Sequence, residues 1–185
     1  MRAVASLFII LTVAGSAAAL NPKESPVIAF GYVARVPQAP FGAALLFFRP
    51  NGVGFYADAK FGPGITEGDD YYDNISIELA ESWGDDRIDT QTNPFSMNLG
   101  VTQVLSRRVG AYAGIGFTRN TTLHQYYDPL HILGNDGRYW IDGGEEFVPN
   151  FLGGLVIFSN GTWGIQLGAE GPEFGATAGV FWSSW

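Results

Sequence analysis

The sequence predicts an all-β fold, an eight-stranded antiparallel up-and-down transmembrane β-barrel, from three observations. Eight segments are strand candidates, and at least five of them alternate apolar and polar residues at a period of two, which is the signature of strands. Beyond the N-terminal segment the chain has no apolar run of helix length, so that only strands are left to cross a membrane. Finally, the connections between the eight segments follow a regular order of short and long.

Each segment is about as long as a tilted strand must be to cross hydrocarbon. Those at 41–48 and 151–158 are apolar on both faces, so their register stays open. In the segment at 53–61 one face is apolar, whereas the other carries Tyr56, Asp58 and Lys60. The eight segments are 27–35, 41–48, 53–61, 96–105, 109–118, 151–158, 162–170 and 174–185.

The connections place all the long excursions at one end of the barrel. The second, fourth and sixth are tight turns at 49–52, 106–108 and 159–161. The third and fifth, at 62–94 and 119–150, run to roughly thirty residues, far beyond the usual two to six. This pattern is typical of outer-membrane barrels, so we expect short periplasmic turns and two long extracellular loops.

The N-terminus reads as a cleavable secretory signal. Arg2 supplies its positive charge, residues 7–13 form a short apolar stretch, and Ala19 ends a run of small residues. The apolar stretch is shorter than the roughly 20 residues of a spanning helix. We therefore expect a signal peptide at 1–19 and a single barrel domain at 20–185.

Composition excludes several classes of function. The 185 residues contain no cysteine, which rules out disulfides, thiol chemistry and an acylated N-terminal cysteine. The formal net charge of −8 leaves no basic face for a nucleic acid. Nine acidic residues against Arg87 alone lie in the third connection, where a solvated surface is the simplest reading.

The second face of the strands is rich in glycine and small polar residues, as the narrow interior of such a barrel requires. A soluble lipocalin-type barrel would instead have an apolar interior and a charged exterior. Because charges inside a barrel must pair, we expect a polar plug there. Its predicted members are Arg35, Tyr56, Asp58, Lys60, Tyr112, Gln166 and Glu170.

Prolines and aromatic residues support the strand boundaries. All ten prolines are expected outside the strands or at their edges, where no hydrogen bond of the ladder is lost. Aromatic residues recur at the strand ends that face the long connections, as in an interfacial girdle. The predicted girdle residues are Phe41, Phe61, Phe95, Phe117, Phe147 and Phe174.

Strand number, the order of the connections and the terminal aromatic Trp185 give the chain a resemblance to the small outer-membrane barrels of the OmpA-like and OmpX-like group. The stretch from Tyr126 to Tyr139 is similar to a loop of uncharacterised outer-membrane β-barrel families. The resemblance implies a Gram-negative outer membrane, with the barrel-assembly machinery reading Phe181 and Trp185. Ser183 departs from that terminal signal, since a hydrophobic residue is expected there.

Catalysis is the first alternative, because lipid A deacylases and acyltransferases use this barrel. The deacylases carry a histidine two residues before a serine, but here Ile157 precedes Ser159. Without a base beside it the hydroxyl is not activated, and Ser-Asn-Gly is a good turn sequence. The only histidines, His124 and His131, lie in the fifth connection, where a role as a weak metal site or general base competes with simple exposure.

Two local questions stay open at this stage. The pairs at 69–70 and 85–86 could hold Ca²⁺ or Mg²⁺, although a solvated acidic face is favoured. The apolar residues between them, from Ile75 to Trp83, fit either a strand or a short helix. Farther along, the turn at 135–137 suggests a hairpin that joins Ile132 and Leu133 to Tyr139 and Trp140.

We therefore expect a non-enzymatic outer-membrane protein with a structural or surface-interaction role, and no catalytic, cofactor or metal residues. A lipid A- or phospholipid-modifying enzyme, a small channel and a soluble ligand-binding barrel are the alternatives. The expected partners are outer-membrane lipids, lipopolysaccharide, the barrel-assembly machinery and an unknown extracellular ligand. Nucleic acid is excluded, and the barrel is expected to be a monomer.

Overall fold

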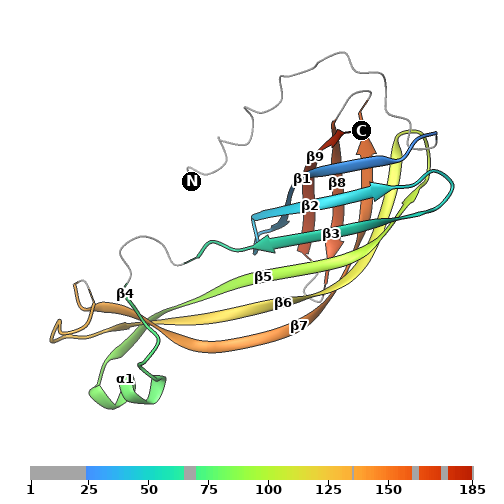
Figure 1. Ribbon diagram of the computed structural model, residues 1–185. Coiled ribbons are helices and arrows are strands. Elements are labelled where there is room, and N and C mark those ends of the chain that lie inside the picture. The colour runs from blue at the N-terminus through green and yellow to red at the C-terminus, as the bar shows by residue number, and fades with distance from the viewer. Residues whose placement is uncertain (1–23, 65–69, 135, 160–162, 172–174, 185) are drawn as a thin grey trace.

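Eight antiparallel strands close into a barrel in the computed structural model (Figure 1), which describes residues 24–64, 70–134, 136–159, 163–171 and 175–184. Closure comes from the pairing of β1 with β9 and of β7 with β8. The barrel strands are β1 (Val27–Val36), β2 (Phe41–Phe48), β3 (Val53–Phe61), β5 (Asp86–Val104), β6 (Val109–Tyr127), β7 (Arg138–Phe158), β8 (Trp163–Glu170) and β9 (Gly175–Ser184).

The predicted signal segment and Trp185 lie outside the described residues. Two small elements stand apart from the barrel. The helix α1 (Ile77–Trp83) and the strand β4 (Asp70–Tyr72) both lie in the third connection, and β4 pairs in parallel with β7. Within the described residues no helix is long and apolar enough to cross a membrane.

Three neighbouring strands are about twice as long as the others. β5 and β6 have 19 residues each and β7 has 21, whereas the remaining barrel strands have 8 to 10. Figure 1 shows the three running together far beyond the end of β3. We call this extension the blade and define it as residues 86–94, 119–127 and 138–147.

The blade shows that much of the two predicted long loops is strand. Most of the fifth connection is strand, because β6 continues to Tyr127 and β7 begins at Arg138. The third connection becomes strand from Asp86 onward. Polar alternation in these stretches was read as loop composition, yet a sheet that stands in water tolerates polar side chains on both faces.

Two prolines lie inside strands, although all ten were expected outside the strands or at their edges. Pro94 belongs to β5 and Pro149 to β7. The carbonyl of Pro94 accepts from the amide of Gly62, just beyond the end of β3, so its nitrogen faces the side where no further strand follows. By the same alternation Pro149 faces the side beyond the end of β8, because Phe151 accepts from Gly171 there. Each proline therefore sits on an edge and interrupts no hydrogen bond with β6.

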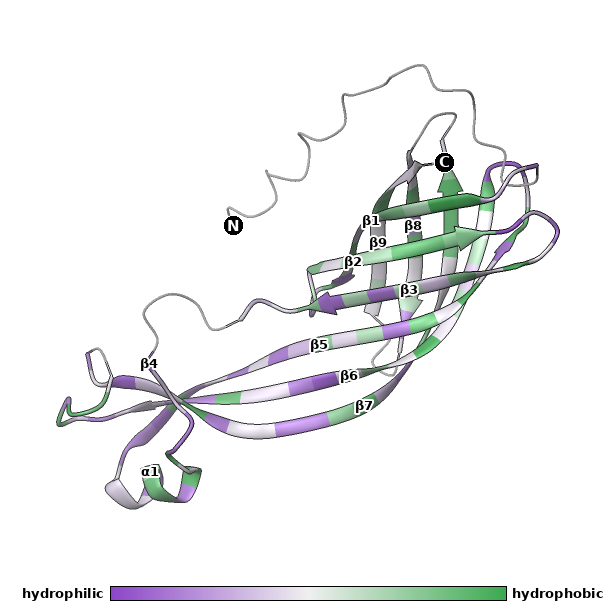
Figure 2. Ribbon diagram, in the orientation of Figure 1, coloured by the Kyte–Doolittle hydropathy of each residue, from purple (hydrophilic) through white to green (hydrophobic). Residues whose placement is uncertain are grey.

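The outer surface of the barrel is apolar. Outward-facing side chains of the barrel include Leu99, Ile115 and Phe151, with 54, 65 and 65 % of their surface exposed. Figure 2 shows hydrophobic colours concentrated on the barrel strands and hydrophilic colours along the blade. An apolar exterior with charges inside is the reverse of a water-soluble barrel, and it fits a hydrocarbon environment.

The predicted aromatic girdle marks the rim from which the blade rises. Phe41 stacks on Phe61 with ring centroids 5.8 Å apart, and Phe61 lies opposite Phe95. Farther round, the rings of Phe117 and Phe147 are 6.1 Å apart. Phe174 lies outside the described residues. At the other rim Trp163 and Trp182 lie opposite each other and are exposed, as interfacial indoles would be.

The interior has two halves. Toward the tight turns it is filled by large apolar side chains, among them Leu46, Phe48, Val156, Phe158 and Phe181. Most of these come from β2 and the end of β7, the two segments whose register was open. Phe181, which we read as part of a terminal assembly signal, points into this core. The other half, toward the blade, is polar.

A charge on the outer barrel surface is expected to destabilise the protein strongly. Leu99 lies opposite Ala57, the middle residue of β3, and so at mid-depth. Leu99→Lys should cost about 2–4 kcal/mol in unfolding free energy, measured by urea titration in phosphocholine vesicles. The matched control Leu79→Lys, on exposed α1, should change stability by less than about 0.5 kcal/mol. Equal effects at the two positions would contradict the membrane-spanning assignment.

Candidate functional site

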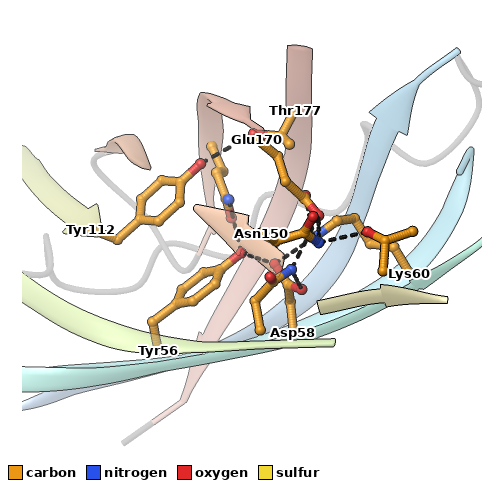
Figure 3. A network of polar contacts seen from close by, with 10 residues as sticks. Tyr56, Asp58, Lys60, Tyr112, Asn150, Glu170 and Thr177 are labelled. Atoms are coloured by element: carbon orange, nitrogen blue, oxygen red, sulfur yellow. Dashed lines mark hydrogen bonds and ion pairs between the residues drawn. The ribbon is translucent and has the colours of Figure 1, made fainter. Parts of the chain in front are cut away.

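The polar half of the lumen is organised around Lys60. Its Nζ lies 2.6 Å from Oδ2 of Asp58 on the same strand and 2.9 Å from Oε2 of Glu170 on β8. All three side chains are completely buried. Figure 3 shows them pointing toward one another across the interior. One cation therefore ties two carboxylates that come from opposite walls of the barrel.

Two asparagines complete the bonding of these carboxylates. Asn98 Nδ2 donates to Asp58 Oδ1 at 2.8 Å, and Asn150 Nδ2 donates to Glu170 Oε1 at 2.9 Å. Gly116 lies between the two asparagines in the register of β5, β6 and β7. A Cβ at Gly116 would come within 2.2 Å of Asn98 Oδ1, so this position must be glycine for the row to form.

Tyrosines close the network toward the apolar half. Tyr56 donates to Asp58 and accepts from Gln166 Nε2 at 3.1 Å. Its ring stacks on Tyr112, with centroids 4.8 Å apart. The hydroxyl of Tyr112 reaches Thr177 Oγ1 at 3.2 Å and passes over Gly168, where a Cβ would lie 2.2 Å from it.

The predicted lumen residues are therefore brought together. Asp58, Lys60 and Glu170 bond directly, and the two tyrosines and Gln166 surround them. Arg35 is also buried, with 4 % of its surface exposed, on β1 at the blade end of the lumen. The interior thus holds two cations, Arg35 and Lys60, and two carboxylates, Asp58 and Glu170. Their charges sum to zero, and buried charges need such compensation.

Above this network a cavity of about 500 Å³ opens at the foot of the blade. Arg35 and Gln38 line it from the barrel, and Asn120 and Glu146 line it from the inner face of the blade. Sequence reasoning missed this cavity, because its blade walls were assigned to loops.

Ser159 is placed away from any histidine. It lies at the turn end of β7, where its amide donates to the carbonyl of Trp163 at 3.0 Å, closing the turn. His124 lies on β6 in the blade, with Nδ1 2.9 Å from Thr90 Oγ1. His131 follows β6, so both histidines are at the opposite end of the molecule from Ser159.

The far end of the blade has a hydrophobic core of its own. Ile75, Ala80, Tyr126, Tyr139 and Ile141 are buried together. α1 contributes through Ala80 and is held by sequence-local caps: Ser76 Oγ accepts from the amide of Leu79, and Gly84 ends the helix in the left-handed conformation. The region from Ile75 to Trp83, open between helix and strand, is thus mainly a helix that packs on the sheet.

The described members of the two acidic pairs differ in their surroundings. Asp85 is buried, and its Oδ2 accepts from the hydroxyl of Tyr139 at 2.6 Å. Burial and this carboxylate raise the pKa of Tyr139. Asp70 and Asp86 are exposed, whereas Asp69 lies outside the described residues. The reading of a solvated face is therefore wrong for Asp85, which is part of the packing.

A short loop after β6 is organised by one carboxylate. Asp128 Oδ1 accepts from the amide of Leu130 at 2.7 Å, and its Oδ2 accepts from Ile132 at 2.6 Å and Leu133 at 3.0 Å. Burial opposes ionisation of Asp128, but these three amides and nearby His131 outweigh it and lower its pKa.

The hairpin predicted around the turn at 135–137 forms, but its two strands pair different residues from those predicted. Tyr139 and Trp140 pair with Tyr126 and Gln125, not with Leu133 and Ile132. Asp128 draws the chain out of the strand before residue 130, which the turn sequence alone did not reveal. The signal that could have found it is Asp128-Pro129, because an aspartate before a tight reversal often bonds the following amides.

No group of three or more histidine, aspartate and glutamate side chains suited to a metal ion occurs within the described parts of the chain. The absence of metal, cofactor and catalytic residues stays a prediction.

No protein-family model matches the chain, and no curated protein matches it in sequence. Its fold is similar to the crystal structure of Ail, the attachment invasion locus protein of Yersinia pestis, with a TM-score of 0.55 and 12 % identity. That likeness covers 86 % of this chain and 97 % of Ail. The complex of Ail with the heparin analogue sucrose octasulfate gives 0.54 and 14 % over the same shares. The fold is thus that of a small outer-membrane β-barrel.

Removal of the buried lysine should destabilise the barrel. Lys60→Met leaves Asp58 and Glu170 without their shared cation, which should cost about 3–5 kcal/mol of unfolding free energy in phosphocholine vesicles. Adding Asp58→Asn and Glu170→Gln to Lys60→Met should recover most of that loss, because no buried charge then lacks a partner. The control Arg49→Met, in an exposed turn, should unfold like the unchanged protein. Wild-type stability of Lys60→Met would contradict the role of the network.

The loop at Asp128 should depend on pH with a defined sign. Its pKa is lowered in the folded protein, so its contribution is present above the ordinary aspartate pKa of about 3.9 and is lost as the pH falls through the folded value. Amide protection factors of Leu130, Ile132 and Leu133 should hold from about pH 7 to about pH 5 and fall below about pH 4. Asp128→Asn should lower them between about pH 5 and pH 7 and remove their pH dependence, whereas exposed Asp136→Asn should do neither. A protection that rises on acidification would show the opposite linkage.

Proposed function

We propose that this small eight-stranded outer-membrane β-barrel is a non-enzymatic protein of the cell surface that contacts other macromolecules through its blade. The observation that carries the proposal is the second hydrophobic core at the far end of the blade. A simple loop needs no such core. Buried packing there keeps one shape in a region that no membrane supports.

The blade also offers hydrogen-bonding edges. β3 stops opposite Phe95, so residues 86–94 of β5 have no strand on their outer side within the described sheet. β8 stops opposite Leu152, and β4 covers only the stretch of β7 from Tyr139 to Ile141. Open edges of this kind can accept an extended segment of another protein.

The lumen supports a structural role more than a channel. An eight-stranded barrel is just wide enough for side chains to fill. Here large apolar residues fill one half and the bonded network around Lys60 crosses the other. We expect no continuous water path between the two rims.

The enzyme alternative was suggested by Ser159, which would need a histidine as its base. Ser159 lies in a turn at one end of the molecule, and both histidines lie at the other end. The soluble alternative conflicts with the exposed apolar side chains around the barrel, such as Ile115 and Phe151. The fold shared with Ail, an attachment invasion locus protein, is compatible with a surface role.

The remaining partners are part of the same proposal. Lipids and lipopolysaccharide surround the apolar band, and the barrel-assembly machinery inserts the chain. We propose a monomer, because the barrel strands satisfy one another's edges without a second copy.

A blade deletion tests this function directly. Replacing residues 64–93 and 120–146 by short turns should leave a barrel that still resists alkaline carbonate extraction. In nanodiscs, the full protein should bind at least one member of a panel of immobilised serum and extracellular-matrix proteins, and the shortened barrel should bind none.

Three results would contradict the proposal. They are equal binding by the two forms, stable single-channel steps in planar bilayers, and turnover of lipid A or phospholipid followed by mass spectrometry. Extraction of the full protein by carbonate would contradict the membrane assignment as well.

A further inference from the structure

The loop at the end of the blade displays two large apolar side chains to water. Leu130 and Ile132 each expose 76 % of their surface, more than any other large apolar residue described. We call residues 128–134 the tip loop. Leu133, their neighbour, instead packs against the hydrophobic core of the blade. The exposure is therefore selective within one short stretch.

The tip loop is held in one conformation by several interactions. The carboxylate of Asp128 accepts from the amides of Leu130, Ile132 and Leu133, as described above. The amide of His131 donates to the carbonyl of Asp128 at 3.1 Å, and its Nε2 lies 3.2 Å from the hydroxyl of Tyr127. Four backbone amides and one imidazole ring thus fix the positions of the two apolar side chains.

His131 has a φ of +56°, in the left-handed region that residues other than glycine rarely adopt. This conformation reverses the chain between Leu130 and Ile132. A strained residue that keeps apolar side chains in water does nothing for the stability of the loop itself. Such local strain is typical of sites that bind, where a rigid anchor loses little entropy on association.

The membrane of the same cell cannot cover this pair. The girdle lies at Phe95, opposite Arg119, and β6 continues from there to Tyr127. Eight residues of strand span up to about 27 Å. Arg119 marks the interface, since its guanidinium lies 5.9 Å from the ring centroid of Phe95. The tip loop is therefore held well away from the lipid.

The net charge of the blade and of the connections beside it indicates which kind of partner fits the tip loop. Described residues of the third and fifth connections carry twelve carboxylates against three arginines, with no lysine. Such a field repels polyanions and anionic lipid surfaces and attracts basic ones. The carboxylates are Asp70, Asp73, Glu78, Glu81, Asp85, Asp86, Asp89, Asp128, Asp136, Asp142, Glu145 and Glu146; the arginines are Arg87, Arg119 and Arg138.

We infer that the tip loop is a preformed apolar anchor, with Leu130 and Ile132 entering an apolar pocket of a partner protein whose rim is basic. The inference rests on the proposed surface role of the blade and names the residues and the partner chemistry. Apolar contact provides the affinity, and charge complementarity guides the approach.

The test uses the whole protein in zwitterionic nanodiscs and a phage-displayed library of random 12-residue peptides. Peptides are selected on the wild-type barrel and counter-selected on empty nanodiscs of the same lipid, and their binding to Leu130→Ser/Ile132→Ser is then measured. Enriched peptides should combine lysine or arginine with large apolar residues. They should bind the double variant at least tenfold more weakly, equivalent to about 1.4 kcal/mol.

The control is Leu79→Ser/Ile88→Ser, which removes two exposed apolar side chains from α1 and β5. It should bind the selected peptides as the unchanged protein does. Heat-modifiable gel migration verifies that all variants are folded. Because Leu130 and Ile132 are exposed, their replacement by serine should not change that migration.

Several outcomes would overturn the inference. They are enrichment of acidic or uncharged peptides, equal losses in the control, and binding to sucrose octasulfate or to zwitterionic vesicles that depends on Leu130 and Ile132. If peptides bind both double variants equally but not the blade-deleted barrel, the anchor fails and the proposed function stands. If the blade-deleted barrel also binds them, both fail.

Discussion

The pairing of every backbone N–H and C=O within the apolar band is the constraint on which the rest of this structure depends. In hydrocarbon no water replaces a missing partner, so the sheet must close through β1 with β9 and β7 with β8. Closure with eight strands makes the interior narrow, and a narrow interior must be filled. The apolar core fills one half of this interior, and the network around Lys60 fills the other. Beyond the girdle water is available, and there the sheet opens and only β5, β6 and β7 continue.

The fold could be predicted from sequence because the membrane demands a regular pattern. Alternation in β3, β5 and β8 gave the outward and inward faces correctly, and the predicted bounds of β2 and β3 agree with the structure. The pairing of Lys60 with acidic neighbours followed from the same alternation. The constraint is strict there, since a shift by one residue would turn Asp58 toward lipid.

The blade was predicted poorly, because outside the membrane the constraint disappears. A strand such as residues 119–127 can be polar on both faces in water, so its composition is that of a loop. Pro94 and Pro149 reinforced that interpretation, although each occupies an edge where its missing N–H is harmless. The arrangement around Asp128 is local, since its carboxylate accepts from the amides of Leu130, Ile132 and Leu133, but composition and periodicity do not reveal it.

The unequal strand lengths have a mechanical consequence. The blade is a direct continuation of barrel strands. A tensile force on its far end is therefore transmitted along β5 and β7 into the wall of the barrel. There it loads the ladder between β3 and β5 in shear, where the nine partner pairs from Val53 to Phe61 resist together instead of opening one after another. The seven pairs between β7 and β8 act in the same way on the other side. When flow drags a bound particle, the force is thus shared by many hydrogen bonds at once. The barrel therefore resists extraction better than it would if the bonds broke one after another.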